Sequence, residues 1–172
     1  MDEKIEIRSL DEGDAEVFRA LHLRALDELP EAFLAVYEEE LCEPLERVAE
    51  RLRGSKPENF YLGVFVNGHL VGMVHFERPG SIKIRHRAYL SGMYVAPERR
   101  GQGLGKALLD RALAHARSLP DLEEVGLWVI IGNQQAEALY QSAGFETFCI
   151  EPRSIKIDDR YYDGAGMIMR LR

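Results

Sequence analysis

Glycine occupies three alternating positions, Gly101, Gly103 and Gly105, within the segment 95–106. Without a Cβ these residues leave backbone N–H groups unshielded, and glycine enters left-handed conformations at low cost. Apolar spacing predicts a helix that begins at Leu104, and its amino terminus adds unpaired amide donors and the positive end of a dipole. The chemistry that this segment suits is the binding of an anion such as a phosphate.

Neither of the two common nucleotide motifs fits this loop. A dinucleotide fingerprint that starts at Gly101 needs glycine at position 106, where the chain has Lys106. A Walker loop that ends at positions 105 and 106 needs glycine at position 100 and serine or threonine at 107, where Arg100 and Ala107 stand. The loop is therefore predicted to bind an anion through a motif other than these two.

The elements that precede the loop follow from periodicity and from turn residues. Period-two alternation predicts a first strand at 4–8, and Asp14 is a predicted cap for a helix to about Glu28. Residues 29–42 are expected to form a loop or an irregular helix, followed by a helix at 43–53. Two apolar runs, 60–66 and 70–76, flank Asn67-Gly68, which is typical of a tight hairpin turn.

The second half alternates strands with helices. The predicted elements are a strand at 87–96, a helix at 104–118 stopped by Pro120, a strand at 124–131, a helix capped by Asn133 and closed by Gly144, and strands at 145–150 and 167–171 around a polar loop. This order predicts an α/β fold with a mixed sheet covered by helices. A chain of 172 residues fits one domain.

Charge is distributed unevenly along the chain. The net charge is −7, but residues 1–60 carry 17 acids and 8 bases, whereas 78–117 carry 2 acids and 9 bases. A basic stretch inside an acidic protein favours a small polyanionic ligand over a long nucleic acid, although a solvated basic face stays open.

The composition also bears on location and on metal binding. The longest apolar candidate, 125–131, is too short to span a bilayer, and the amino terminus lacks the pattern of a secretion signal. A cytoplasmic protein without membrane association is expected. Cys42 and Cys149 lie far apart without metal-ligand spacing, so neither a disulfide framework nor a metal site is predicted.

Arg100, Gly103 and Gly105 fit the pattern Arg/Gln-x-x-Gly-x-Gly/Ala, and Asn133 with the segment 138–145 follows at the expected distance. In these motifs the chain resembles the GCN5-related N-acetyltransferase (GNAT) superfamily. The resemblance implies a seven-stranded, mixed and mostly antiparallel sheet flanked by about four helices. It further implies one N-acetyltransferase domain over residues 1–172 that uses acetyl-coenzyme A (acetyl-CoA) as cosubstrate and no metal.

The resemblance also implies which residues bind the coenzyme. The pyrophosphate is expected on the loop that comprises Arg100, Gly101, Gln102, Gly103, Leu104, Gly105 and Lys106. Pantetheine is expected to pair like a strand with the main chain of Met93 and Val95, and the Val95 amide would polarise the thioester carbonyl. Asn133 would contact the coenzyme directly or through water, although a plain helix cap is the alternative.

Tyr140 is the catalytic candidate, because it matches the family position whose hydroxyl donates to the departing thiolate. A plain core tyrosine is the alternative. Some relatives place a glutamate base on the strand before the loop, where this chain has Tyr89. The general base therefore stays open among Tyr89, His75, Glu77, His86 and water. Direct attack in a ternary complex is favoured, since neither cysteine lies in a recognisable Cys-His arrangement.

The acceptor is expected to be a primary amine, with a small molecule favoured over a peptide. Acidic residues of the early helices would suit a cationic amine, unless they are only a solvated face: Asp27, Glu28, Glu31, Glu38, Glu39 and Glu40. The alternatives are an enzyme that acetylates protein amino termini or lysines, and a sensor that binds acyl-coenzyme A without catalysis. The connections 78–86 and 151–166 would shape the pocket or pair two copies into a homodimer.

Overall fold

The computed structural model describes residues 3–53 and 56–171. In chain order the elements are β1 (Ile5–Ser9), α1 (Ala15–Glu28), α2 (Tyr37–Cys42), α3 (Leu45–Arg53), β2 (Asn59–Val66), β3 (His69–Glu77), β4 (Arg87–Val95), α4 (Leu104–Ser118), β5 (Glu124–Ile130), α5 (Gln134–Ala143), β6 (Glu146–Ile157) and β7 (Arg160–Arg170). The strands form one seven-stranded sheet in the order β1-β2-β3-β4-β5-β7-β6. Neighbours are antiparallel except for β4 and β5, which confirms the predicted mixed sheet.

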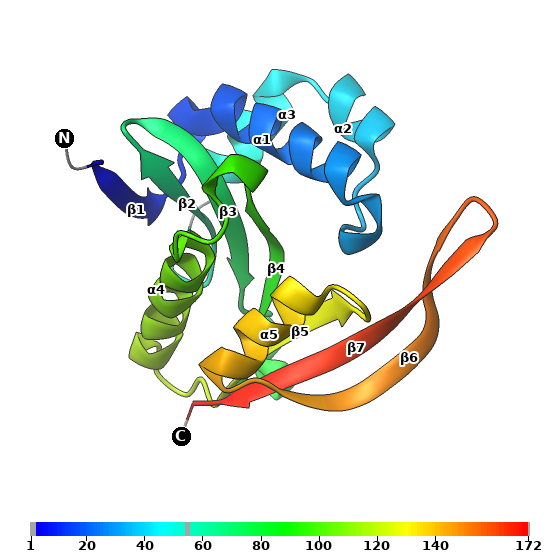
Figure 1. Cartoon of the computed structure of the whole chain (residues 1–172). Helices are drawn as coiled ribbons and strands as arrows, with labels where there is room; N and C mark the ends of the chain where they lie inside the picture. Colours follow the sequence, from blue (N-terminus) through cyan, green and yellow to red (C-terminus); the bar gives the residue numbers. More distant parts are fainter. Residues whose placement is uncertain (1–2, 54–55, 172) are drawn as a thin grey trace.

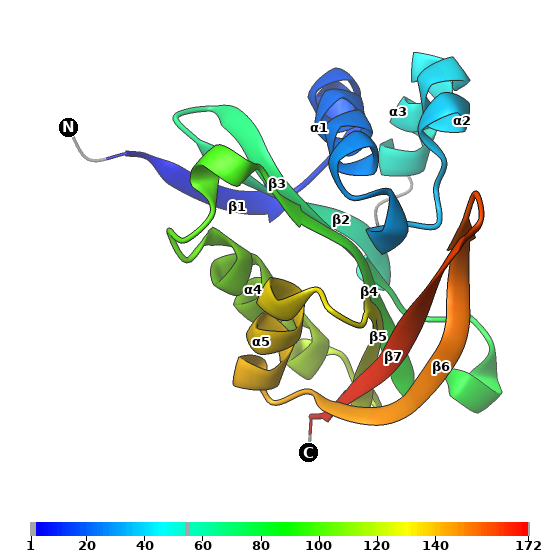
Figure 2. The same cartoon turned by 45° about the vertical axis from the view of Figure 1, so that its right-hand side comes forward.

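Helices cover both faces of the sheet (Figures 1 and 2). Helices α1, α2 and α3 lie on one face, and α4 and α5 lie on the other. On the α4 face Leu108, Leu109 and Ala112 are fully buried against apolar strand residues. On the α1 face Phe18 and Leu52 pack in a second apolar cluster. The sheet is therefore the middle of three layers, with an apolar cluster on each of its faces.

The β2–β3 hairpin and the boundaries of α1, α4 and α5 agree with the sequence predictions. Asn67 and Gly68 adopt φ of 51° and 83°, as a tight hairpin turn requires. Gly144 follows α5 with φ of 101°, which is the left-handed closure expected of glycine.

Asp14 does not cap α1 through its side chain, contrary to the prediction. Its carboxylate instead accepts two hydrogen bonds from Arg8, at 2.6 and 2.7 Å, and one from the Asp11 amide at 3.0 Å. The hydrogen bonds from Arg8 outweigh burial and hold the pKa of Asp14 below its ordinary value. The residue therefore joins β1 to the start of α1 by a charge-assisted contact.

The expected polar loop at 151–166 is instead the outer part of a long β6–β7 hairpin. Pairing of Ile155 with Tyr162 and of Ile157 with Arg160 carries both strands almost to the turn. A bulge interrupts β6, and there the Arg153 guanidinium lies 3.8 Å from the centre of the Tyr161 ring. Backbone pairing and this cation-π contact stabilise a segment that has little apolar alternation.

Candidate active site

Strands β4 and β5 pair over only part of their length. Their parallel ladder joins Arg87–Leu90 to Glu124–Leu127, whereas β4 continues to Val95 and β5 continues to Ile130. Beyond Leu90, the edge of β4 that faces β5 has no strand partner in the described part of the chain. Its main-chain groups are therefore open to a ligand that pairs like a strand.

A bulge lies in this open part of β4. Met73 of β3 is opposite Tyr94, and His75 is opposite Ser91, so β4 uses one more residue than β3 over this interval. Gly92, within the bulge, has φ of 60°. The extra residue bends β4 and increases its separation from β5.

The orientation of the Val95 amide follows from the ladder beyond the bulge. The Ala96 amide donates to the Val71 carbonyl at 2.8 Å, so Val95, opposite Gly72, occupies a non-hydrogen-bonded position. At such a position the N–H and C=O groups point away from the neighbouring strand. Arg100 Nε donates to the Val95 carbonyl at 2.9 Å, which leaves the amide of Val95 directed toward the gap.

The glycine loop leads from β4 into α4 with an open backbone surface. Gly101 and Gly103 adopt φ of 74° and 79°, and a Cβ at either position would have no atom within 4 Å. Gly103 is the residue before α4, and no side chain caps the helix. The first amides of α4 lack intrahelical partners, so the loop has the open space and the donors that a pyrophosphate requires.

Arg100 is held by neighbouring protein groups rather than left free for a phosphate. Its Nη2 lies 2.5 Å from Glu28 Oε1, and the Tyr94 hydroxyl donates to the other oxygen of Glu28 at 2.7 Å. Burial, followed by this hydrogen bond, raises the pKa of Tyr94 to about 12. The guanidinium of Arg100 is thus already paired with Glu28, and the predicted coenzyme contact of Arg100 stays a prediction that its backbone amide can satisfy.

Ion pairs also offset much of the positive charge in the segment 78–117. Lys106 lies 2.6 Å from Asp110, and Arg99 lies 2.8 Å from Glu3. Arg78 and Arg85 both contact Glu58, and Arg87 contacts Glu124. Attraction for phosphates is consequently left mainly to backbone amides and the α4 dipole.

The remaining residues of the loop differ in exposure. Gln102 is exposed, and its side-chain amide donates to the Glu98 carbonyl at 3.4 Å. The Leu104 side chain is buried in the core, so only its amide faces the loop. A Cβ at Gly105 would make ordinary van der Waals contacts, at 3.6 Å from Leu139 and 3.7 Å from Val95, so packing does not require glycine there.

A cleft of about 690 Å³ extends through the gap between β4 and β5 to the α1 side of the sheet. Met93, Asn133 and Tyr140 line it, so the structure brings together three predicted site residues from β4 and from the α5 region. A second cavity of about 550 Å³ lies between β2 and α4, and its lining includes none of the predicted site residues.

Tyr140 is buried at 7% exposure and contacts Phe145 edge to face. Burial raises its pKa to about 12, so the phenol stays protonated at neutral pH. No hydrogen bond of its hydroxyl is found within residues 3–53 and 56–171. A protonated, unpaired phenol that lines a cleft can donate a hydrogen bond or a proton to a ligand.

Asn133 caps α5, because its Oδ1 accepts from the Ala136 amide at 3.2 Å. The predicted capping role is thus confirmed. The NH₂ group of the same side chain is still a donor toward the cleft that Asn133 lines.

Three of the four side chains considered as general bases line the cleft, namely His75, Glu77 and Tyr89. They come from neighbouring strands, and Glu77 is directly opposite Tyr89. His86 does not line the cleft; it precedes β4, and its carbonyl accepts from the Glu123 and Glu124 amides at the far end of the sheet.

Of the acidic residues expected to face the amine, the structure places Glu31 in the cleft. Glu28 forms an ion pair with Arg100, and Glu40 forms one with Arg51. The cleft lining does not include Asp27, Glu38 or Glu39. The expected acidic face is thus reduced to one of its members.

Other lining residues were not anticipated from the sequence. They are aromatic side chains and a carboxylate from four elements and one connection: Phe18, Phe33, Tyr61, Trp128 and Glu151. Their common location depends on the β6–β7 hairpin and on the 29–36 connection, which border the same cleft. No local pattern predicts such a convergence.

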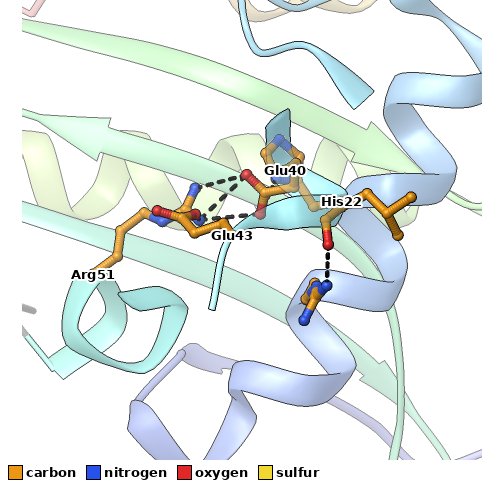
Figure 3. A network of polar contacts seen from close by, with 6 residues as sticks. His22, Glu40, Glu43 and Arg51 are labelled. Carbon is orange, nitrogen blue, oxygen red and sulfur yellow. Dashed lines mark hydrogen bonds and ion pairs between the residues drawn. The ribbon is translucent and has the colours of Figure 1, made fainter. Parts of the chain in front are cut away.

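A polar cluster of His22, Glu40, Glu43 and Arg51 (Figure 3) borders the acceptor end of the cleft, which His22 and Arg51 line. Arg51 of α3 contacts Glu40 at 3.0 Å and Glu43 at 2.5 Å. His22 Nδ1 lies 3.1 Å from Glu40, although the atoms are not aligned as a hydrogen bond. The cluster joins α1, α2 and α3, so it fixes the wall that the three helices present to the cleft.

Glu40 is expected to make the stability of the fold dependent on pH. Burial alone would raise its pKa, but His22 and Arg51 outweigh burial and hold the pKa at about 2, against an ordinary 4.5. The ionised carboxylate therefore stabilises the fold above about pH 4.5, and this stabilisation is lost as the pH falls toward 2. Urea unfolding at a series of pH values should show a shallower acid loss for Glu40→Gln than for the unmodified protein.

Glu38→Gln, which removes an exposed carboxylate from the same helix, is the control and should keep the original pH dependence. If the free energy of unfolding fell equally with pH in the unmodified protein and in Glu40→Gln, Glu40 would not be the source of the acid loss.

The Acetyltransferase (GNAT) family matches residues 22–145 of the chain. The open β4 edge and the glycine loop that follows it lie within this range, so the chain belongs to the GNAT acetyltransferase family. No helix in the described ranges is both long and apolar enough to cross a membrane.

Named relatives extend the comparison. A mycothiol acetyltransferase from Thermobispora bispora is 34% identical over 154 residues, covering 87% of this chain and 49% of the relative. A spermidine N(1)-acetyltransferase from Vibrio cholerae is 31% identical over 101 residues, covering 58% of this chain and 56% of the relative. The chain spans about half or less of the curated mycothiol acetyltransferases that it matches.

Solved structures share the fold. The Salmonella typhimurium protein yncA, solved with its cofactor acetyl-CoA, superposes with a TM-score of 0.81 at 21% identity, over 98% of this chain and 94% of that one. At this identity the likeness establishes the fold alone, which is the GNAT fold expected from the sequence.

Proposed function

We propose that residues 1–172 form one N-acetyltransferase domain that transfers the acetyl group of acetyl-CoA to a small cationic primary amine. The observation that carries this proposal is a path along the chain: β4 is unpaired on its β5 side beyond Leu90, it leads into the open glycine loop, and Met93 on this edge lines the cleft. One end of this path offers amides to phosphates, and the other offers carboxylates and aromatic rings to an amine. Membership in the GNAT family supports the same assignment.

In this proposal the pyrophosphate binds the amides of Gly101 to Lys106, and pantetheine pairs with the main chain of Met93 and Val95. The amide of Val95 points into the gap, where it would hydrogen-bond pantetheine, with the thioester beyond it toward Met93. Tyr140 donates to the departing thiolate, and Asn133 contacts the coenzyme through its NH₂ group. The amine attacks the thioester directly in a ternary complex.

The acceptor end suits a positive charge joined to an alkyl chain. Glu31, Glu77 and Glu151 line it, and none of them forms a salt bridge within the described ranges. Arg51 also lines it, but Glu40 and Glu43 already pair with this guanidinium. Aromatic walls from Phe33, Tyr61 and Trp128 suit the alkyl portion and the ammonium group. Names of relatives that include spermidine and mycothiol support a small-molecule acceptor.

The test is release of free thiol from acetyl-CoA in the presence of alkyl diamines, neutral amines and extended peptides. Glu31→Gln should raise KM for the best diamine about tenfold, equivalent to about 1.4 kcal/mol of lost attraction, with little change in kcat. Glu38→Gln, an exposed carboxylate that does not line the cleft, is the matched control and should leave KM unchanged.

Turnover only with extended peptides would replace the small-molecule acceptor with a protein acceptor. Binding of acetyl-CoA without thiol release across the whole panel would favour a sensor and would overturn the proposed catalysis.

A further inference from the structure

His75 lies between two polar side chains that determine which of its ring nitrogens carries the hydrogen. Its Nε2 is 2.9 Å from Asn59 Oδ1, and its Nδ1 is 3.2 Å from Ser91 Oγ. The amide oxygen of Asn59 can only accept, so Nε2 carries the hydrogen of the neutral ring. The lone pair of Nδ1 is thereby directed at the hydroxyl of Ser91, which donates to it.

The ring is held in this orientation by its neighbours. It stacks on Tyr61 with ring centres 4.3 Å apart and planes 23° apart. His75 and Ser91 are opposite each other in the β3–β4 ladder, so the backbone register fixes their contact. Side chain and backbone therefore specify the same geometry.

Ser91 lies at the point where the cleft opens. It follows Leu90, the last residue of β4 that pairs with β5, and it precedes Met93 by two residues. Both Ser91 and His75 line the cleft. In the proposed function pantetheine runs along β4 from Val95 toward Met93, which brings its acyl end to the vicinity of the Ser91 hydroxyl.

We infer that Ser91, His75 and Asn59 form a proton relay that accepts the proton of the attacking amine. This inference rests on the proposed function. When the amine nitrogen bonds to the acyl carbon, its N–H bond breaks and the proton passes to Ser91 Oγ. The original hydroxyl proton of Ser91 passes at the same time to His75 Nδ1, and the resulting imidazolium donates through Nε2 to Asn59. Solvent in the cleft then takes the proton from the imidazolium.

In this relay Ser91 is the catalytic residue, because it contacts the reacting nitrogen, whereas His75 and Asn59 are positioning residues that act through it. The charged and titratable groups around the ring are Tyr61 on β2, Glu77 on β3, Tyr89 on β4 and Arg51 on α3. Burial, assisted by Arg51 and opposed by Glu77, lowers the pKa of His75 below its ordinary 6.5. The ring is thus neutral, and able to accept a proton, at pH 7.

The inference is tested by the pH dependence of kcat with saturating acetyl-CoA and the best diamine. The unmodified protein should lose activity below about pH 6.5, as His75 becomes protonated. His75→Gln should lower kcat by about 100-fold, remove this acid limb and leave the Kd for acetyl-CoA unchanged. His69→Gln, at the exposed opposite end of β3, is the control and should behave as the unmodified protein.

Two further variants separate the relay from a structural role. Asn59→Asp should move the acid limb of kcat upward by about one pH unit, because a carboxylate at Nε2 stabilises the imidazolium. Ser91→Ala should lose activity in parallel with His75→Gln, whereas Ser91→Thr should retain it. A merely structural contact would not move the acid limb.

An unchanged kcat and acid limb in His75→Gln would overturn the relay and leave the proposed acetylation standing. The same is true of an Asn59→Asp variant that folds, is active and shows no shift. Absence of any amine turnover in the unmodified protein would instead overturn the proposed function, and the relay with it.

Discussion

Gly103→Asp is expected to weaken acetyl-CoA binding by at least about 100-fold, equivalent to about 2.8 kcal/mol. Gly103 has φ of 79° and immediately precedes α4, where the proposed pyrophosphate meets unpaired amides. A carboxylate at this position places a negative charge where the helix dipole favours an anion, and it would repel the phosphates. Isothermal titration calorimetry with acetyl-CoA measures the effect.

Two controls separate charge from backbone strain. Gly103→Asn places a neutral side chain of similar size in the same left-handed conformation, which asparagine tolerates well, and should keep most of the affinity. Gly68→Asp introduces aspartate at φ of 83° in the β2–β3 turn, outside the cleft, and should leave binding unchanged. A folded Gly103→Asp protein with the original Kd would contradict the assignment of the loop.

Tyr140→Phe is expected to lower kcat by about 100-fold with less than about a twofold change in the Kd for acetyl-CoA. The substitution removes only the hydroxyl, and the ring can still pack against Phe145. Without the phenol, the departing thiolate lacks its proposed donor. Because the pKa of Tyr140 is about 12, the phenol should add no alkaline limb to the rate below about pH 10.

Single-turnover measurements are suited to this variant, because they separate the chemical step from product release. Tyr161→Phe removes a hydroxyl from the exposed hairpin, outside the cleft lining, and should be fully active. If Tyr140→Phe were as active as this control, Tyr140 would be a packing residue only.

Local patterns were sufficient for most elements of the fold. Apolar spacing and the stops at Pro120 and Gly144 located α4 and α5, because a helix that buries one face must repeat apolar residues every three or four positions. Asn67 and Gly68 located the β2–β3 hairpin for an equally local reason. The loop residues Gly101 and Gly103 were likewise recognisable, since each adopts a conformation that favours glycine.

Features that depend on distant pairing were not predictable in this way. The ion pair between Arg100 and Glu28 is one example, because the two residues lie 72 positions apart in the sequence. The extension of β6 and β7 is another, since backbone pairing stabilises it without strong apolar alternation. The contact between His75 and Ser91 depends on the β3–β4 register and its bulge, neither of which has a local sequence signal.

Titration of the unmodified protein with acetyl-CoA, with ATP and NAD as controls for general anion binding, tests the central claim most directly. The open β4 edge and the glycine loop predict micromolar affinity for acetyl-CoA and for coenzyme A, with much weaker binding of ATP and NAD. No binding of acetyl-CoA, or equal binding of all these ligands, would contradict the claim that the path from the loop to the cleft is a coenzyme site.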